Sequence, residues 1–139
     1  MGRLACLLLL LFGSLPFARA EELLVIAHPS VPETSLGPDA LAAIYLLKTS
    51  AWRGGEFIVP VNREAQSAER ARFSATVLHQ SPAALAAFWN QMHFKGKLPP
   101  VVQESDQAVL AFVQKVPGAV GYVNAGVAPK NVKVLARVP

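Results

Sequence analysis

Cysteine is almost absent from this sequence. The only cysteine, Cys6, lies in the apolar stretch at the N-terminus. The rest of the chain therefore has no thiol for a disulfide, a nucleophile or a zinc site. A domain without disulfides has to be stabilised by its own hydrophobic core, and a chain of this length is long enough to form one.

The first twenty residues have the pattern of a secretory signal peptide. Arg3 is followed by an apolar run over residues 4–17 and by Ala18-Arg19-Ala20, a small-x-small cleavage pattern. The run is shorter than a membrane-spanning helix needs, and no second long apolar segment follows, although a retained anchor is the alternative. We expect cleavage after Ala20, export to the periplasm and a single domain over residues 21–139, which is 139 − 20 = 119 residues.

Basic runs and catalytic motifs are also missing. Without the two arginines of the signal, 13 − 2 = 11 Lys and Arg face 9 Asp and Glu, a net charge of +2. Because no basic stripe is present, we expect no nucleic-acid partner. No nucleophile elbow, P-loop or dinucleotide-binding glycine pattern occurs. His28, His79 and His93 are too widely spaced for a metal site. We therefore predict no enzyme, no metal and no cofactor.

Strand-like and helix-like segments alternate along the mature chain. Apolar runs predict strands over residues 23–28, 57–61, 119–123 and 132–138. Helical spacing and capping residues predict helices over residues 39–48, 68–78 and 106–115, and one that begins at Pro82. Strands separated by helices are typical of an α/β fold. We expect three layers, with a mainly parallel central sheet and flanking helices.

The helix that begins at Pro82 carries one continuous apolar stripe. Leu85, Phe88, Trp89 and Met92 recur at helical spacing. Such a stripe is more often part of a hydrophobic core than a platform for a ligand. We expect these four side chains to face the core.

The segment PVNREAQSAERARF, residues 60–73, is a candidate anion site. Arg63 ends a predicted strand, and Ser67 precedes a predicted helix whose first amides have no intrahelical acceptor. Arg63 could supply charge, Ser67 a hydroxyl, and Ala68 and Glu69 backbone N–H groups. The same spacing is explained if Ser67 only caps its own helix while Arg63 is solvated. Both interpretations stay open.

Two segments resemble a known family. LAAIYLLKTSAWRGGEFIVPVNREAQSAERARF and PGAVGYV are similar to the inner lobe of the phosphate-binding proteins of ABC transporters, which are type II periplasmic solute-binding proteins. The resemblance runs from about residue 23 to residue 134, and the family's second lobe is missing. In the family's R-x-D-G-S-G-T phosphate loop, Arg63 matches the arginine and Ser67 the serine. Ala65, Gln66 and Ala68 replace the aspartate and glycines, and Glu69 stands at the threonine position.

The resemblance implies a solute-binding-like protein for phosphate or another oxyanion in ABC-type uptake. The departures disfavour tight binding, because non-glycine residues limit backbone approach and a carboxylate repels an anion. The alternative is a non-enzymatic interaction module in the periplasm with a decayed ligand site. Its partner would be an ABC transporter, another envelope protein or a second copy. We expect docking on one face formed by residues 28–35, residues 62–67 and the Gly121-Tyr122 region, with Tyr122 and Arg63 as anchors.

Overall fold

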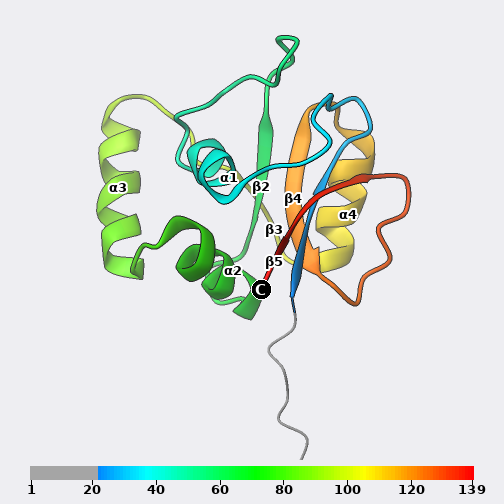
Figure 1. Cartoon of the computed structure of the whole chain (residues 1–139). Coiled ribbons are helices and arrows are strands. Elements are labelled where there is room, and N and C mark those ends of the chain that lie inside the picture. Colours follow the sequence, from blue (N-terminus) through cyan, green and yellow to red (C-terminus); the bar gives the residue numbers. More distant parts are fainter. Residues whose placement is uncertain (1–21) are drawn as a thin grey trace, which may run out of the picture.

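A five-stranded sheet with helices on both faces forms the fold in the computed structural model, which describes residues 22–139 (Figure 1). The predicted signal peptide and its cleavage site lie outside the described residues. The strands are β1 (Leu23–Ala27), β2 (Val59–Arg63), β3 (Val101–Gln103), β4 (Ala119–Asn124) and β5 (Lys133–Val138). The helical segments are α1 (Pro38–Tyr45), α2 (Ala68–Phe73), the π-helical turn η1 (Ser74–Leu78), α3 (Pro82–Phe94) and α4 (Asp106–Lys115).

The sheet is mainly parallel, as predicted. Its strand order is β3-β2-β4-β1-β5. β2 pairs in parallel with β3 and with β4, whereas β1 pairs antiparallel with both β4 and β5. β5 therefore points the same way as β2, β3 and β4, and only β1 is reversed. The carboxyl end of β1 therefore lies at the end of the sheet where the other four strands begin, opposite the carboxyl end of β2.

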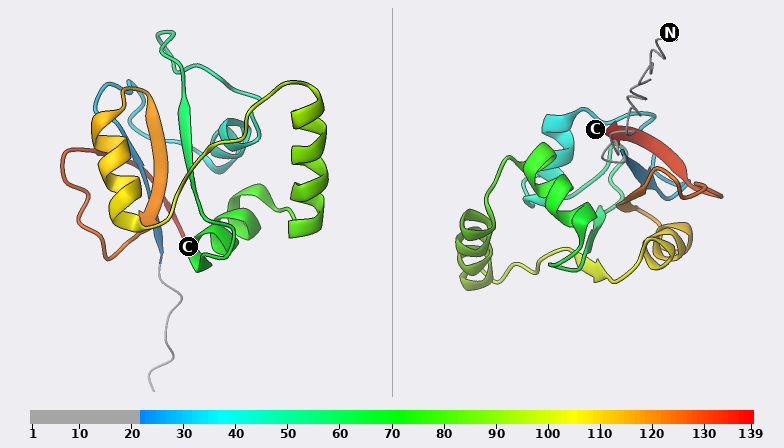
Figure 2. Two further views of the ribbon diagram at one scale, coloured as in Figure 1. Left: turned by 180° about the vertical axis from the view of Figure 1, so that it is seen from behind. Right: turned by 90° about the horizontal axis from the view of Figure 1, so that it is seen from below.

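Two hydrophobic cores fill the space on either side of the sheet, so the predicted three-layer arrangement is confirmed (Figure 2). All five residues of β1 are buried, and they alternate between the cores. Leu23, Val25 and Ala27 join the core under α1, α2 and η1, whereas Leu24 and Ile26 join the core under α4. A strand that is buried on both faces has a continuous run of apolar residues, which is why β1 could be predicted from the sequence.

Two of the predicted helices differ at their C-terminal ends: the first is shorter than predicted, and the second ends in a π-helical turn. α1 ends at Tyr45 rather than Lys48, because the amide of Lys48 bonds the carbonyl of Ala43 in a wider turn and Leu47 has a φ of 59°. The helix predicted over residues 68–78 continues to Leu78, but its last five residues are the π-helical turn η1. His79 ends it in the left-handed conformation, with a φ of 51°.

The prediction that the stripe of α3 faces the core is confirmed only for Leu85, which packs against the core under α1, α2 and η1. The helix has no buried residue, and its stripe, Leu85, Phe88, Trp89 and Met92, is only half-buried. Figures 1 and 2 show α3 at one side of the molecule, away from the sheet. Helical periodicity predicts that a helix has an apolar side, but it contains no information on what covers that side.

The edge strand β3 was not predicted from the sequence. It has three residues and pairs in parallel with β2, with Val61 opposite Val101. Val101 and Val102 are exposed, which is common for an edge strand. A three-residue segment that follows two prolines is too short to give a strand signal of its own.

Candidate functional site

Arg63 ends β2 and is almost completely enclosed by acidic side chains. Its guanidinium bonds Glu64 twice, with Nε 3.0 Å from Oε2 and Nη2 3.1 Å from Oε1. Its Nη1 lies 2.6 Å from Oδ1 of Asp106, at the first residue of α4, and 3.6 Å from Oε2 of Glu69 in α2. Arg63 is 7% exposed. The interpretation in which Arg63 is solvated is therefore wrong.

The acidic neighbours of Arg63 differ in their protonation behaviour. The hydrogen bonds with Glu64 raise the pKa of Arg63, and the same bonds lower the pKa of Glu64. Partial burial raises the pKa of Asp106, and the attraction of Arg63 offsets this only in part. Asp106 therefore ionises less readily than a free aspartate, although it makes the shortest contact with the guanidinium.

Ser67 caps α2 and is itself buried. Its Oγ accepts a hydrogen bond from the amide of Arg70 at 3.0 Å, as expected of a residue at the N-terminus of a helix. The Arg70 guanidinium in turn donates to the carbonyl of Arg63 at 2.9 Å. The predicted cap is therefore present, and the Ser67 hydroxyl keeps a proton that it can donate.

A shallow pocket of about 290 Å³ adjoins this cluster. Its lining consists of Leu23, Ala68, Glu69, Arg72 and Asn124. Nη1 of Arg72 is buried and has no hydrogen-bond acceptor among the described residues. Arg72 was not singled out in the sequence, although it lies three residues after Glu69 and so shares that side of the helix. Asp106 was also missed, because it is 43 residues from Arg63 in the chain.

Tyr122 is buried, so it cannot anchor a partner as we expected. Its side chain is 1% exposed, and its ring stacks on Phe73 with centroids 4.1 Å apart. The hydroxyl donates to Oδ1 of Asn62 and accepts from the amide of Arg63 at 3.3 Å. Burial raises the pKa of Tyr122 to about 12. Tyr122 positions the end of β2 from within the core.

The three segments that we expected on one face do not lie together, because the loop after β1 and the loop after β2 lie at opposite ends of the strands. The amide of His28 bonds the carbonyl of Ala119, and Ser30 Oγ accepts from the amide of Gly118 at 3.2 Å. The loop after β1 therefore lies at the start of β4. Arg63 and the carboxylates around it lie at the opposite end of the strands, near the end of β4. The expectation is wrong because β1 is antiparallel, which cannot be read from its apolar run.

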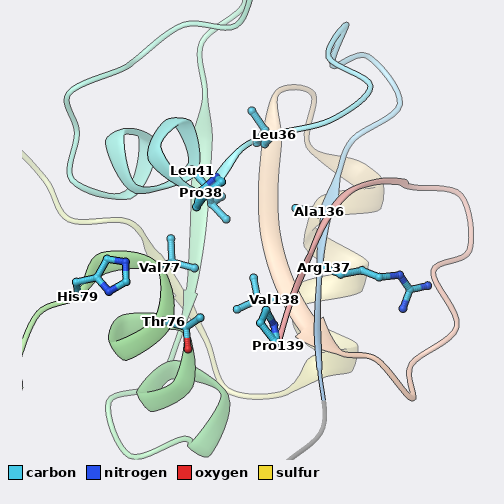
Figure 3. Close-up of a pocket in the computed structure, with 10 residues that line it drawn as sticks. All are labelled: Leu36, Pro38, Leu41, Thr76, Val77, His79, Ala136, Arg137, Val138 and Pro139. Atoms are coloured by element: carbon cyan, nitrogen blue, oxygen red, sulfur yellow. The ribbon is translucent and has the colours of Figure 1, made fainter.

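A larger pocket of about 340 Å³ lies away from Arg63, between α1, η1 and β5 (Figure 3). Its lining is mostly apolar. The side chain of Arg137 points away from the other lining residues, and its Nη1 lies 3.4 Å from Oε2 of Glu22. We assign no site to this pocket, because it directs no charged group inward.

No cluster of three or more His, Cys, Asp or Glu side chains that could hold a metal ion occurs in residues 22–139. Within the same residues, no helix has the length and apolar character that crossing a membrane requires.

Comparison with solved structures gives clear matches. An ABC-type phosphate transport receptor from Vibrio cholerae matches with a TM-score of 0.66 and 21% identity, over 83% of this chain and 45% of that chain. PstS from Borrelia burgdorferi matches with a TM-score of 0.66 and 18% identity, over 84% of this chain and 47% of that chain. The chain thus spans less than half the length of these proteins. No protein-family model and no curated protein matches the sequence. The chain therefore has the fold of the matching part of the phosphate ABC transporter substrate-binding proteins, the family that its motifs resemble.

Proposed function

We propose that this chain is a periplasmic solute-binding-like protein that holds phosphate or another oxyanion at the carboxyl end of β2, in connection with ABC-type uptake. The observation that carries the proposal is the pocket lined by Ala68, Glu69 and Arg72. The buried Nη1 of Arg72 has no acceptor among the described residues. A buried guanidinium nitrogen without an acceptor is costly, and an oxygen of an oxyanion would satisfy it.

The first turn of α2 adds donors to the same pocket. The amides of Ala68 and Glu69 have no intrahelical acceptors, and Ser67 has a hydroxyl proton to donate. Arg63 would act on the anion through its charge rather than by direct contact, because its nitrogens already bond Glu64 and Asp106. The positively charged groups in contact with the ligand are therefore fewer than the resemblance implies.

Glu69 gives the pocket a preference among oxyanions. An ionised carboxylate can only accept hydrogen bonds, so it repels sulfate, which has no proton at neutral pH. Phosphate at neutral pH keeps at least one proton and can donate it to Glu69. The proposed ligand is therefore a protonated oxyanion such as hydrogen phosphate.

Affinity from this chain alone should be weak. One lobe leaves much of the ligand in water, where charge interactions are strongly reduced by the high dielectric constant. We expect a millimolar Kd, which corresponds to about −4 kcal/mol. A second copy or another envelope protein that covers the pocket would raise the affinity.

Phosphate titration followed by NMR tests this proposal at residue level. In the chain from Glu21 onward, the amide resonances of Ala68 and Glu69 should shift with a millimolar midpoint. Arg72→Gln should abolish the shifts, whereas Arg53→Gln, which removes an exposed arginine elsewhere, should leave them unchanged. Equal responses in the two variants would refute the proposed site.

A non-enzymatic interaction module is the second candidate. It is favoured by the engagement of every guanidinium nitrogen of Arg63 by a carboxylate, which removes the arginine of the resembling loop from ligand contact. In that case neither phosphate nor sulfate would shift the amides of α2.

A further inference from the structure

The two most exposed large apolar side chains among the described residues lie on either side of the turn after α3. Phe94 is 90% exposed and Leu98 is 82% exposed. Backbone bonds order this turn, since the amides of Lys95 and Lys97 bond carbonyls of α3 at 3.0–3.2 Å. Gly96 reverses the chain with a φ of 73°. The two apolar side chains are therefore held in water by an ordered turn.

Positive charge alternates with these apolar side chains. Lys95 and Lys97 flank Gly96, and neither ammonium group has an ion-pair partner among residues 22–139. The chain contains no Asp or Glu between Glu69 and Glu104. This part of the molecule presents apolar and cationic groups without any acidic side chain to offset them.

The apolar stripe of α3 lies on the side of the helix that faces away from Phe94, because Phe94 follows Met92 by two residues, about 200° of helical rotation. α3 has no buried residue, and its half-buried stripe includes Phe88 and Trp89, whose rings meet edge to face with centroids 4.9 Å apart. Figures 1 and 2 show that α3 stands at the side of the molecule, and its end leads directly into the turn. The exposed end of the helix and the turn form one surface, residues 94–98, which we call the α3 surface.

We propose that the α3 surface binds an anionic lipid bilayer, with Phe94 and Leu98 inserted below the headgroups and Lys95 and Lys97 at the lipid phosphates. Aromatic and aliphatic side chains beside lysines are typical of segments that lie in a membrane interface without spanning it. The thirteen residues of α3 are too few to cross a bilayer. This inference does not depend on the proposed oxyanion site.

The charge of the surface favours a bilayer over a protein partner. Lysine is depleted in protein interfaces and arginine is enriched, yet the cations of the α3 surface are both lysines. A lysine has three donors on a flexible chain and fits a diffuse layer of phosphates better than one fixed carboxylate.

Vesicle co-sedimentation of the chain from Glu21 onward tests the proposal, since all described helices and strands follow that residue. Protein should sediment with vesicles of phosphatidylglycerol and phosphatidylcholine, and less with phosphatidylcholine alone. Added salt should weaken the binding, because it screens the lysines.

Matched variants separate the contribution of the lysines to membrane binding from that of the apolar side chains. Lys95→Gln with Lys97→Gln should lower the partition coefficient about 30-fold, from about 1 kcal/mol for each lysine. Lys115→Gln with Lys130→Gln removes the same net charge from α4 and the loop before β5, and it should have no effect. Phe94→Ser with Leu98→Ser should lower partitioning at least about 100-fold. All of these side chains are exposed or half-buried, so circular dichroism should show that each variant remains folded.

Three results would overturn the proposal. One is wild-type protein that stays in the supernatant with anionic vesicles. Another is an equal loss of binding in the two double-lysine variants. The third is a dimer that Phe94→Ser with Leu98→Ser dissociates, in the absence of vesicle binding, because a second copy would then cover the α3 surface.

Discussion

Nη1 of Arg63 and Oδ1 of Asp106 lie 2.6 Å apart. This pair joins the carboxyl end of β2 to the amino end of α4. The arginine that the family resemblance assigns to a ligand is thus bound to a carboxylate of the same chain. The pair changes the expected chemistry of the site, because an oxyanion would have to compete with Asp106 for Nη1.

The first prediction concerns the stability that this pair provides. Asp106→Ala should lower the free energy of unfolding by about 1–2 kcal/mol, because a charged hydrogen bond and a favourable charge in the first turn of α4 are lost. Glu64 continues to pair with Arg63, which limits the loss. Urea unfolding measures the difference. An Asp106→Ala variant as stable as the wild type would show that the pair does not contribute to stability.

The second prediction concerns the turn before β4. Gly118 has a φ of 80°, and a Cβ there would collide with the backbone carbonyl oxygen of Phe57. Gly118→Ala should lower the free energy of unfolding by about 3 kcal/mol through combined strain and overlap.

Gly96 provides the control for that variant. It has a φ of 73°, but a Cβ there would meet nothing within 4 Å. Gly96→Ala should therefore cost only about 1 kcal/mol, from the left-handed conformation alone. Equal losses in the two variants would contradict the predicted overlap at Gly118.

The third prediction concerns alkaline pH. Burial raises the pKa of Tyr122 to about 12 in the folded chain, from the ordinary tyrosine value of 10.0. The unfolded chain therefore loses this proton first, so stability is fully present below pH 10 and falls as the pH rises toward 12. The loss at pH 11 should be about 1 kcal/mol.

Tyr122→Phe isolates this contribution from that of Tyr45, whose pKa burial also raises. The variant should be less stable than the wild type at pH 8, because the hydrogen bond to Asn62 is lost. The difference in stability between the variant and the wild type should narrow by about 1 kcal/mol at pH 11. A gap that stays constant between the two pH values would contradict the prediction.

Much of the fold can be predicted from local patterns. Ser81 and Ser105 directly precede two of the predicted helices, and their Oγ atoms accept from the amides of Ala84 and Ala108 at 3.1 Å and 3.0 Å, as capping residues do. The direction of β1 could not be predicted, because an apolar run does not record which strand it pairs with. The element that packs against the apolar stripe of α3 could not be predicted for a similar reason, because such a stripe does not identify its neighbour.

The candidate site could be predicted only in its local part. Arg63 and Ser67 are four residues apart, and the strand-loop-helix pattern places them together. Asp106 reaches the same guanidinium from a distant helix, and the unpaired Nη1 of Arg72 depends on the packing of α2 beside Leu23. Such contacts follow from the sheet order, which the sequence pattern does not contain.

The fourth prediction concerns processing of the N-terminus. Mass spectrometry of protein recovered from the periplasm should show a chain that begins at Glu21, because Ala18-Arg19-Ala20 follows a short apolar run. An intact Met1 in the membrane fraction would contradict both the cleavage site and the periplasmic location.

A comparison of phosphate with sulfate in the wild type and in Glu69→Gln tests the oxyanion site most directly. The wild type should bind phosphate with a millimolar Kd, about −4 kcal/mol, and sulfate more weakly. Glu69→Gln should bind sulfate more tightly than the wild type does, because the amide no longer repels an unprotonated anion and can donate to it. Sulfate binding that is unchanged by Glu69→Gln, or submicromolar phosphate binding that survives Arg72→Gln, would contradict a site at this pocket.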